Sequence, residues 1–432
     1  MTLFSLDPGL LLGLLCIVVG GVMLVSLRGF FIFHPIKCLL GLVPLLSDRA
    51  RRRSFTLALA GTLGVGNIYG VAIGIILGGE GCVFWLLVSS VFALVIKYSE
   101  CLMAASVTDS RGLGMMGVLP VTFKRVGRPL SKIYAVLMLI LSLLMGSFIQ
   151  ADSLISSAIY LMPVGRIAIA IALLLLVVAV IIGGGEKIKA STEIMIPIVT
   201  LVYILLCLFV IGKNISGLGP LISRIIHYAF APRPMIFGIL PVINITAFSE
   251  GFARGILSNE AGVGTSSVAE SEERSDPIAS GLFGMCEIVF DTLLLCMLTA
   301  FMILLTVKKP ITYTSPMELV FDAVRIGAGD FALPVLFFSI FIFAYSTIVC
   351  WYYYGCECVA YLGLSRYKSL FLFFFLLFII LAAFVNTYLA VRLNDYVLLL
   401  MSIPTAAAIL SNRKIIKERT CESGIFKKKG RK

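Results

Sequence analysis

The chain has 432 residues, of which 60% are hydrophobic and only 13% are charged. Soluble domains carry about 25% charged residues, so this composition, with a mean hydropathy of +1.06, excludes a soluble domain and indicates an integral membrane protein. The formal net charge of +12 would suit a nucleic-acid binder, but nine of the 35 Lys and Arg residues lie in the C-terminal tail 412–432. We therefore expect no nucleic-acid partner, and we expect the tail to meet anionic lipid headgroups.

Long apolar runs follow one another along the whole chain. About 20 apolar residues cross the hydrocarbon core as a helix, and these runs are too long for the alternating strands of a β-barrel. We therefore predict an all-α integral membrane protein with about eleven transmembrane helices. Two less continuous segments, 214–233 and 307–329, are predicted to be re-entrant or interfacial. The predicted spans are 9–31, 54–78, 82–107, 128–162, 165–184, 190–212, 234–256, 277–306, 330–360, 368–390 and 393–411.

The distribution of positive charge predicts the orientation. With the N-terminus outside, the loops assigned to the inside hold 25 of the 35 Lys and Arg residues, and the outside loops hold eight. Loops rich in Lys and Arg stay on the cytoplasmic side. We expect a multi-pass plasma-membrane protein with its N-terminus outside and its C-terminus in the cytoplasm.

Enzyme and metal motifs are not found in the sequence. The chain has no HExxH, GxSxG or Walker-type pattern. Most of the 11 cysteines are single residues within apolar runs, and the pair Cys356 and Cys358 has no second Cys/His cluster. We predict no catalytic residue and no metal site of the Cys/His type.

Residues 61–70 read GTLGVGNIYG and interrupt an apolar span with four glycines. Each glycine costs a helix about 1 kcal/mol relative to alanine. One interpretation is a broken helix near Gly64–Gly66, whose free backbone groups bind a carboxylate or a small cation, with Thr62 and Asn67 adding oxygens. The other interpretation is close helix packing through small residues.

A second break is predicted in the other half of the chain. Pro241, with Asn244, interrupts the span that opens MIFGILPVINITAF, which favours a broken helix at 237–250. A broken helix in each half is typical of a transporter with a site at the membrane midplane. The following residues 249–276 are polar; they are predicted to be cytoplasmic, as a gate or a solvated loop.

Polar side chains occur in several other spans, where they usually face the bundle interior. Gln150 in the fourth span either binds a polar ligand or ties two helices together. The hydroxyls of Ser346 and Thr347 suit a hard cation, or bond to carbonyls of their own helix. Trp351 lies on the same helix face as Thr347 and either closes a pocket or packs.

Two pairs of charged residues within predicted spans suggest an ionic role. Lys97 and Glu100 at i,i+3 are expected to neutralise each other. Glu287 and Asp291 at i,i+4 are expected to share one helix face, where they could share a proton or meet a cation.

The chain resembles the alanine or glycine:cation symporter family, the sodium:alanine symporters. The resemblance runs from about Arg28 to Ser411, and GILSNEAGVGTS and STIVCW are its most specific stretches. The similar segments are ALAGTLGVGNIYGVAIGIILGGEGCVFW, KYSECLMA, FIQADS, FARGILSNEAGVGTSSVAE, FDTLLLCMLTA, STIVCWYYYGCE and NDYVLLLMSIPTAAAIL.

This resemblance implies a leucine-transporter-like fold of two inverted five-helix repeats with one extra N-terminal helix. The implied parts are 1–53 for the extra helix and its loop, 54–212 and 234–411 for the repeats, 213–233 for the external segment and 412–432 for the basic tail. The broken helices at 61–67 and 237–250 would then be the first helices of the two repeats.

The family also implies a function and a site. The function would be sodium-coupled symport of a small neutral amino acid, with sodium as the co-transported ion. The substrate site would comprise Gly64, Val65, Gly66, Asn67, Gln150, Thr347 and Trp351, and the sodium site would comprise the Leu63 carbonyl, Ser346 and Thr347.

Two departures from the family pattern concern this site. Val65 stands where the family usually has threonine, and FGILPVINITAF is poor in glycine where the family's second broken helix is rich in it. The alternatives are a proton-coupled transporter that uses Glu287 or Asp291, and a non-transporting amino-acid sensor that keeps the fold.

Overall fold

A computed structural model describes residues 7–29, 49–108, 113–181, 184–230, 244–268, 276–385 and 387–422. These residues form helices and turns, and no strand occurs among them. The α-helices are α1 (Pro8–Ser26), α4 (Arg49–Thr62), α5 (Val71–Gly78), α6 (Cys82–Ser106), α7 (Met115–Thr122), α8 (Gly127–Leu141), α9 (Gln150–Leu161), α10 (Arg166–Ile181), α11 (Gly184–Lys213), α12 (Leu218–Phe230), α13 (Ile245–Asn259), α15 (Pro277–Ile288), α16 (Met297–Thr306), α17 (Pro316–Ala328), α18 (Leu333–Tyr361), α19 (Lys368–Leu381), α20 (Thr387–Ser411) and α21 (Arg413–Glu422).

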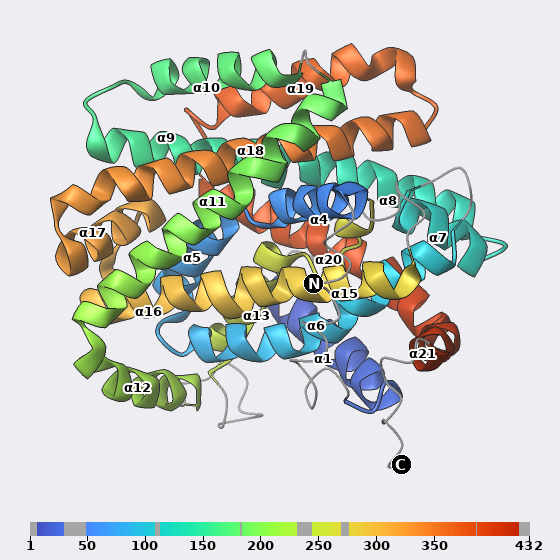
Figure 1. The fold of residues 1–432 in the computed structure, drawn as a ribbon, viewed down its shortest axis with the longest axis horizontal. Helices are drawn as coiled ribbons and strands as arrows, with labels where there is room; N and C mark the ends of the chain where they lie inside the picture. The colour runs from blue at the N-terminus through green and yellow to red at the C-terminus, as the bar shows by residue number, and fades with distance from the viewer. Residues whose placement is uncertain are drawn as a thin grey trace.

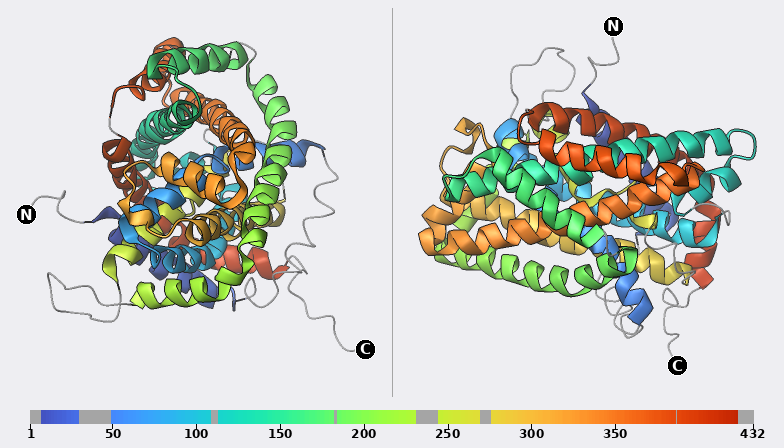
Figure 2. Two further views of the ribbon diagram at one scale, coloured as in Figure 1. Left: turned by 90° about the vertical axis from the view of Figure 1, so that its left-hand side faces the viewer. Right: turned by 90° about the horizontal axis from the view of Figure 1, so that it is seen from above.

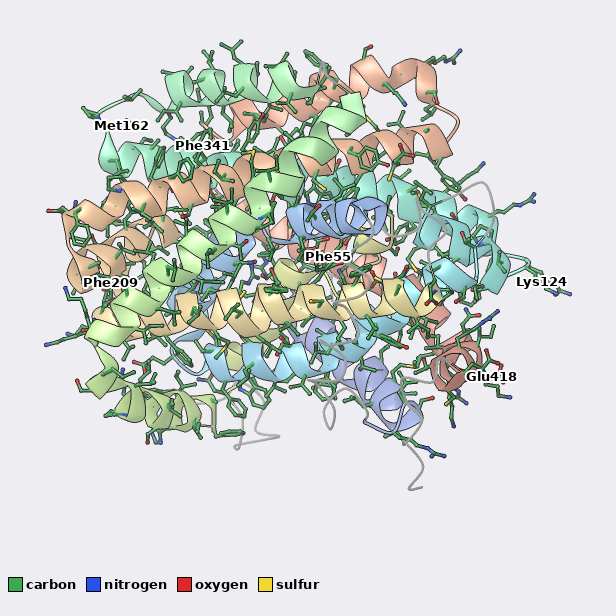
Figure 3. The ribbon with its side chains drawn as sticks, in the orientation of Figure 1. Phe55, Lys124, Met162, Phe209, Phe341 and Glu418 are labelled. Carbon is green, nitrogen blue, oxygen red and sulfur yellow. The ribbon has the colours of Figure 1, made fainter. Side chains whose placement is uncertain are left out.

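Most of the long helices run between two opposite ends of the molecule. In Figure 1, α12 and α17 lie at the left end, and α7 and α21 lie at the right end. Met162 and Phe209 mark the left end in Figure 3, and Lys124 and Glu418 mark the right end. Helices α10 and α19 pack against each other at the edge of the bundle (Figure 2).

Seven helical stretches among the described residues are long and apolar enough to cross a membrane. An eighth span is bent by 41° between Phe55–Thr62 and Gly66–Gly78. Every predicted span contains a helix, but α10, α13 and α19 have only 16, 15 and 14 residues. The chain is therefore an all-helical membrane protein, and the number of eleven spans remains a prediction.

The predicted boundary between the last two spans is wrong. It was placed at 391–392, whereas α19 ends at Leu381 and α20 begins at Thr387. Helix α20 continues through the predicted connection, and the polar residues Asn394 and Asp395, which the predicted span 393–411 includes, are buried within it. The carboxylate of Asp395 accepts a hydrogen bond from Arg254 of α13, and this buried pairing allows a charged residue to lie inside the helix.

The break predicted near Pro241 lies outside the described residues; of the predicted range 237–250 the structure describes only 244–250, where α13 begins at Ile245 with Asn244 as its N-cap. A second break, which the sequence did not predict, follows this helix. Helix α13 ends at Asn259, and the backbone has positive φ at Glu260 (54°), Gly262 (79°) and Gly264 (95°) before helix resumes at 266–268. Two of the three are glycines, which adopt this conformation without strain.

Two polar segments were given special roles by the sequence. Nearly all residues from 249 to 268 are buried, so this part of the segment 249–276 is not a solvated loop, and its role as a gate stays a prediction. In the segment 307–329, predicted to be re-entrant or interfacial, helix α17 has 13 residues, packs against α9 and α16 and buries most of its residues. In 214–233, helix α12 buries only one face, through Leu221, Ile225 and Ala229.

Helix α6 packs closely against α13 through glycines of α13. A Cβ atom on Gly251 would lie 2.5 Å from the Cys82 carbonyl oxygen and 2.6 Å from Trp85 Cβ. A Cβ atom on Gly255 would likewise overlap the Ser89 hydroxyl of α6. Small residues of this kind let two helix backbones approach in a membrane, and here they hold α13 in place beside α6.

We predict that Gly251→Ala destabilises the protein by about 1–3 kcal/mol, because the added methyl group overlaps backbone atoms of α6. Thermal unfolding in detergent measures the effect. Gly21→Ala is the matched control, since Gly21 also lies within a helix but has no atom within 4 Å of its Cβ position. Equal unfolding temperatures for the two variants would contradict the prediction.

Candidate functional site: two helix breaks at the bundle centre

The first break lies between α4 and the π-helical segment η3 (Gly66–Gly70). In a continuous helix, the N–H groups of Gly64 and Val65 would bond to the carbonyls of Ala60 and Gly61. The Gly64 N–H instead donates to Thr62 O at 2.8 Å, and the Val65 N–H donates to Gln150 Oε1 at 3.1 Å. The break therefore leaves two buried carbonyls, those of Ala60 and Gly61, without their helical partners.

Side chains of α18 take the place of those partners. Thr347 Oγ1 donates to the Ala60 carbonyl at 2.9 Å, and Trp351 Nε1 donates to the Gly61 carbonyl at 3.3 Å. Residues 347 and 351 lie one helical turn apart, so both reach the same break. An unpaired buried backbone group costs about as much free energy as a lost hydrogen bond. The side-chain contacts avoid that cost at the Ala60 carbonyl, the Gly61 carbonyl and the Val65 N–H.

Glycines at positions 64 and 146 leave room for the three predicted side chains, Gln150, Thr347 and Trp351. A Cβ on Gly64 would lie 2.8 Å from Thr347 Oγ1 and 3.2 Å from both amide atoms of Gln150. Gly146, one turn before Gln150, packs directly against Trp351. The glycines thus let α9 and α18 approach the broken helix.

Three π-helical segments lie around this centre. They are η3 itself, η4 (Ser142–Ile149) immediately before Gln150, and η6 (Val289–Cys296), which contains Asp291. Short π-helical segments are frequent at functional sites because they shift the register of side chains and free backbone groups. In η4 the Met145 carbonyl accepts a hydrogen bond from Gln150 Nε2 at 3.2 Å, which orients the amide whose oxygen contacts Val65.

The second break lies beside the first. A Cβ on Gly66 would lie 3.5 Å from Ser258 Cα, and Thr62 Oγ1 lies 3.5 Å from Ser266 Oγ. Ser258 Oγ contacts Asn67 Oδ1 at 2.5 Å and the two carboxylate oxygens of Asp291 at 3.0 and 2.8 Å. A cluster of oxygen atoms therefore joins both broken helices to η6.

The free backbone groups of the second break are also paired with side chains. Lys97 Nζ donates to the Asn259 carbonyl at 3.0 Å, and Glu100 Oε2 accepts the Gly262 N–H at 3.0 Å. Tyr134 Oη donates to the Val263 carbonyl at 2.7 Å. The charged side chains of α6 thus stabilise the break instead of forming the expected pair.

The expected neutralisation of Lys97 by Glu100 is therefore replaced by a different ion pair. Lys97 Nζ lies 3.5 Å from Glu287 Oε2, with both side chains fully buried. The predicted pair of acids also separates, because Glu287 faces Lys97 and Thr62, whereas Asp291 faces Ser258 and Thr292. The helix is π-helical from Val289 onward, and each acid has its own donors.

Most of the residues predicted for the site come together. Gln150, Thr347 and Trp351 contact residues 60–65, and Asn67 lies on the other side of the same break. Ser346 is buried, but its hydroxyl donates to carbonyls of its own helix, Ile342 O at 2.8 Å and Phe343 O at 3.1 Å. Its role and that of the Leu63 carbonyl as sodium ligands remain predictions.

Two residues that join the breaks, Ser258 and Ser266, were not predicted individually, although both lie in the segment 249–276 that was predicted to be a gate or a solvated loop. A signal for the second break is present in the sequence, because the tripeptide Gly-Val-Gly occurs at 64–66 in the first break and again at 262–264 in the second.

A cavity of about 460 Å³ lies between the broken helix and one end of the bundle, bordered by Tyr69, which directly follows the first break. At its wall Asp152 accepts hydrogen bonds from Arg166 at 2.7 Å and from Thr387 at 2.6 Å. Arg166 also donates to the carbonyls of Ala382 and Ala383. The cavity is open to solvent and reaches η3 at Tyr69. It lies toward the end of the bundle marked by Met162 in Figure 3.

Known proteins with similar sequences identify the family of this chain. The model of the sodium:alanine symporter family matches residues 16–431. An uncharacterised transporter of Haemophilus influenzae is 30% identical over 84% of this chain and 81% of its own length. The sodium/alanine symporter AgcS of Methanococcus maripaludis is 29% identical over 75% of this chain and 74% of its own length.

Among solved structures, MhsT in complex with L-phenylalanine superposes with a TM-score of 0.57. The match covers 88% of this chain and 98% of that chain at 12% sequence identity, so it shows the fold alone. The fold is leucine-transporter-like, as predicted, and the family consists of transporters rather than enzymes. The chain belongs to the sodium:alanine symporter family, a family of secondary amino-acid symporters that span the membrane several times.

Proposed function

We propose that the protein is a sodium-coupled symporter of a small neutral amino acid that works by alternating access. The observation that carries this proposal is the first helix break, at which side chains from α9 and α18 converge on the backbone at 60–65. Backbone amides at a broken helix bind a carboxylate, and its carbonyls bind a small cation. The family description supports the same function.

The proposed substrate site lies at Gly64, Val65, Gly66 and Asn67, with Gln150, Thr347 and Trp351 around it. The amino-acid carboxylate would bind to backbone amides of this break, where Gln150 Oε1 now accepts the Val65 N–H. The family description supports alanine or a similar small amino acid as the substrate, while Val65 departs from the family's usual threonine at this break.

The proposed sodium site is formed by the Leu63 carbonyl and the hydroxyls of Ser346 and Thr347. Both hydroxyls donate their protons to carbonyls, so their oxygen lone pairs remain available for a cation. Sodium at this point would link α18 to the broken helix and raise the affinity for the amino acid, and the amino acid would raise the affinity for sodium equally.

We further propose that the protein lies in the plasma membrane with its N-terminus outside and its C-terminus in the cytoplasm. The loop charges support this orientation. The cavity beside Tyr69 would then open to the outside, and the basic tail would meet anionic headgroups of the inner leaflet.

Uptake of labelled alanine, glycine and serine into proteoliposomes tests the function. We expect uptake of at least one of them to be driven by an inward sodium gradient. An uptake rate that is independent of the sodium gradient and increases with a proton gradient would reject sodium coupling. Binding of the amino acids without uptake would instead identify a sensor that keeps the fold.

Removal of both hydroxyls of the sodium site tests the ion ligands. We expect Ser346→Ala combined with Thr347→Val to raise the sodium concentration for half-maximal uptake about tenfold or more, which equals about 1.4 kcal/mol. Ser402→Ala is the matched control, because its buried hydroxyl bonds only to the Leu398 carbonyl of its own helix. An unchanged sodium requirement would remove these residues from the site.

Replacement of Gln150 by methionine tests the role of its amide. The buried Val65 N–H would lose its acceptor, and we expect the ligand-free protein to lose about 1–3 kcal/mol of stability. Thermal unfolding in detergent is the measurement, and Gln150→Glu, which keeps an acceptor oxygen, is the control. Equal stability of Gln150→Met and the wild type would show that the hydrogen bond to Val65 contributes nothing.

A further inference from the structure

A second group of buried charges lies beside the site described above. It consists of Lys97 and Glu100 of α6, Glu260 at the second helix break and Glu287 of α15. Each of these four residues is at most 1% exposed. None of them belongs to the proposed substrate or sodium site.

The three carboxyl groups differ in their hydrogen-bond donors. Glu287 Oε2 lies 3.5 Å from the Lys97 ammonium and accepts hydrogen bonds from Ser266 at 2.7 Å and Thr62 at 3.2 Å. Glu100 accepts the Gly262 backbone N–H. Glu260 accepts a hydrogen bond from the hydroxyl of Thr265, its one donor in the described part of the chain. In all three, the Oε1 atom is buried and has no hydrogen-bond partner among the described residues.

The charges of this group do not balance. If all three carboxyls were ionised, Lys97 would neutralise one and leave two negative charges buried in the membrane. An unneutralised buried ion costs several kcal/mol. A bound proton removes this cost at one carboxyl. A metal cation fits poorly, because the Lys97 ammonium already lies against Glu287 and would repel it.

Glu260 is the best candidate to carry that proton. Glu287 has the ammonium and two hydroxyl donors, and Glu100 has a backbone donor, so both have better support for the ionised form. Among the described residues, the groups that act on Glu260 from the surrounding elements include one cation, Lys97. They are Lys97 and Glu100 of α6, Glu287 of α15, Asp291 of η6, Thr265 of the break itself, Tyr134 of α8, and Cys350 and Tyr354 of α18.

The position of Glu260 connects its proton to conformational change. It caps the C-terminus of α13 in the left-handed conformation, at φ 54°, where non-glycine residues are uncommon. Thr62 at the end of α4 and Ser266 after the second break both donate hydrogen bonds to Glu287. Both broken helices therefore contact this group of buried charges. If either helix moved, water would reach the carboxyl of Glu260.

We propose that Glu260 is a proton-binding site of the transport cycle, protonated while the second break is buried and deprotonated when the break opens to water. This inference rests on the proposed function. It adds a proton to the ions that move during the cycle, beside the sodium ion.

Proteoliposomes with a trapped pH-sensitive dye test the proposal, with valinomycin and equal potassium on both sides to hold the voltage at zero. We expect alanine, added with a sodium gradient, to change the internal pH in wild-type vesicles. Glu260→Gln should reduce this change at least fivefold while sodium-driven alanine uptake continues, and Glu260→Asp should keep it. Glu80→Gln, at a peripheral ion pair with Arg224, is the control and should also keep it.

Three outcomes would overturn the proposal or its basis. Sodium-driven alanine uptake in the wild type without any pH change would reject the proton site and leave the proposed function intact. A full pH change in Glu260→Gln would also reject it. Absence of alanine uptake under every gradient would instead reject the proposed function with this substrate, and the same assay would then be decisive with glycine or serine.

Infrared spectroscopy of the wild type in lipid provides a measurement that needs no variant to fold. We expect the carbonyl band of a protonated carboxylic acid at neutral pH in the ligand-free protein. Absence of this band would overturn the proposal. Its loss in Glu260→Gln, with retention in Glu80→Gln, would assign the proton to this residue.

Discussion

The architecture of this symporter depends on one constraint, which is that a broken helix inside a membrane must have its free backbone groups bonded. At the first break, the carbonyls of Ala60 and Gly61 lose their helical donors, and Thr347 and Trp351 of α18 replace them. Gln150 of α9 accepts the free N–H of Val65. Two helices distant in sequence are thereby fixed against the break, and the same contacts build the candidate site.

The second break obeys the same constraint with different chemistry. Its free groups, the Asn259 carbonyl and the Gly262 N–H, meet the charged side chains of Lys97 and Glu100. The first break thus has neutral partners, and the proposed amino-acid and sodium sites lie at it. The second has charged partners, and their imbalance points to a proton at Glu260.

Hydrogen bonds shared by the two helix breaks also explain how a change at one break can alter the other. Thr62 and Ser266, one from each break, both donate to Glu287, while Asn67 and Asp291 both contact Ser258. A ligand that moves either broken helix must change these shared hydrogen bonds. Differential contacts of this kind are what a coupled transport cycle requires.

The sequence alone determined the fold class, the approximate spans, the first break and most of the residues around it. Apolar runs of membrane-spanning length and a glycine-rich interruption are local properties, and local properties can be read from order and composition. The sequence did not predict the break after α13, because the polar residues around Gly262 and Gly264 were equally compatible with a gate or a solvated loop. Nor did it pair Lys97 with Glu287 or Arg254 with Asp395. Those pairings join residues 141 to 190 positions apart, and a buried charge finds its partner by proximity in the folded bundle, which only the tertiary structure decides.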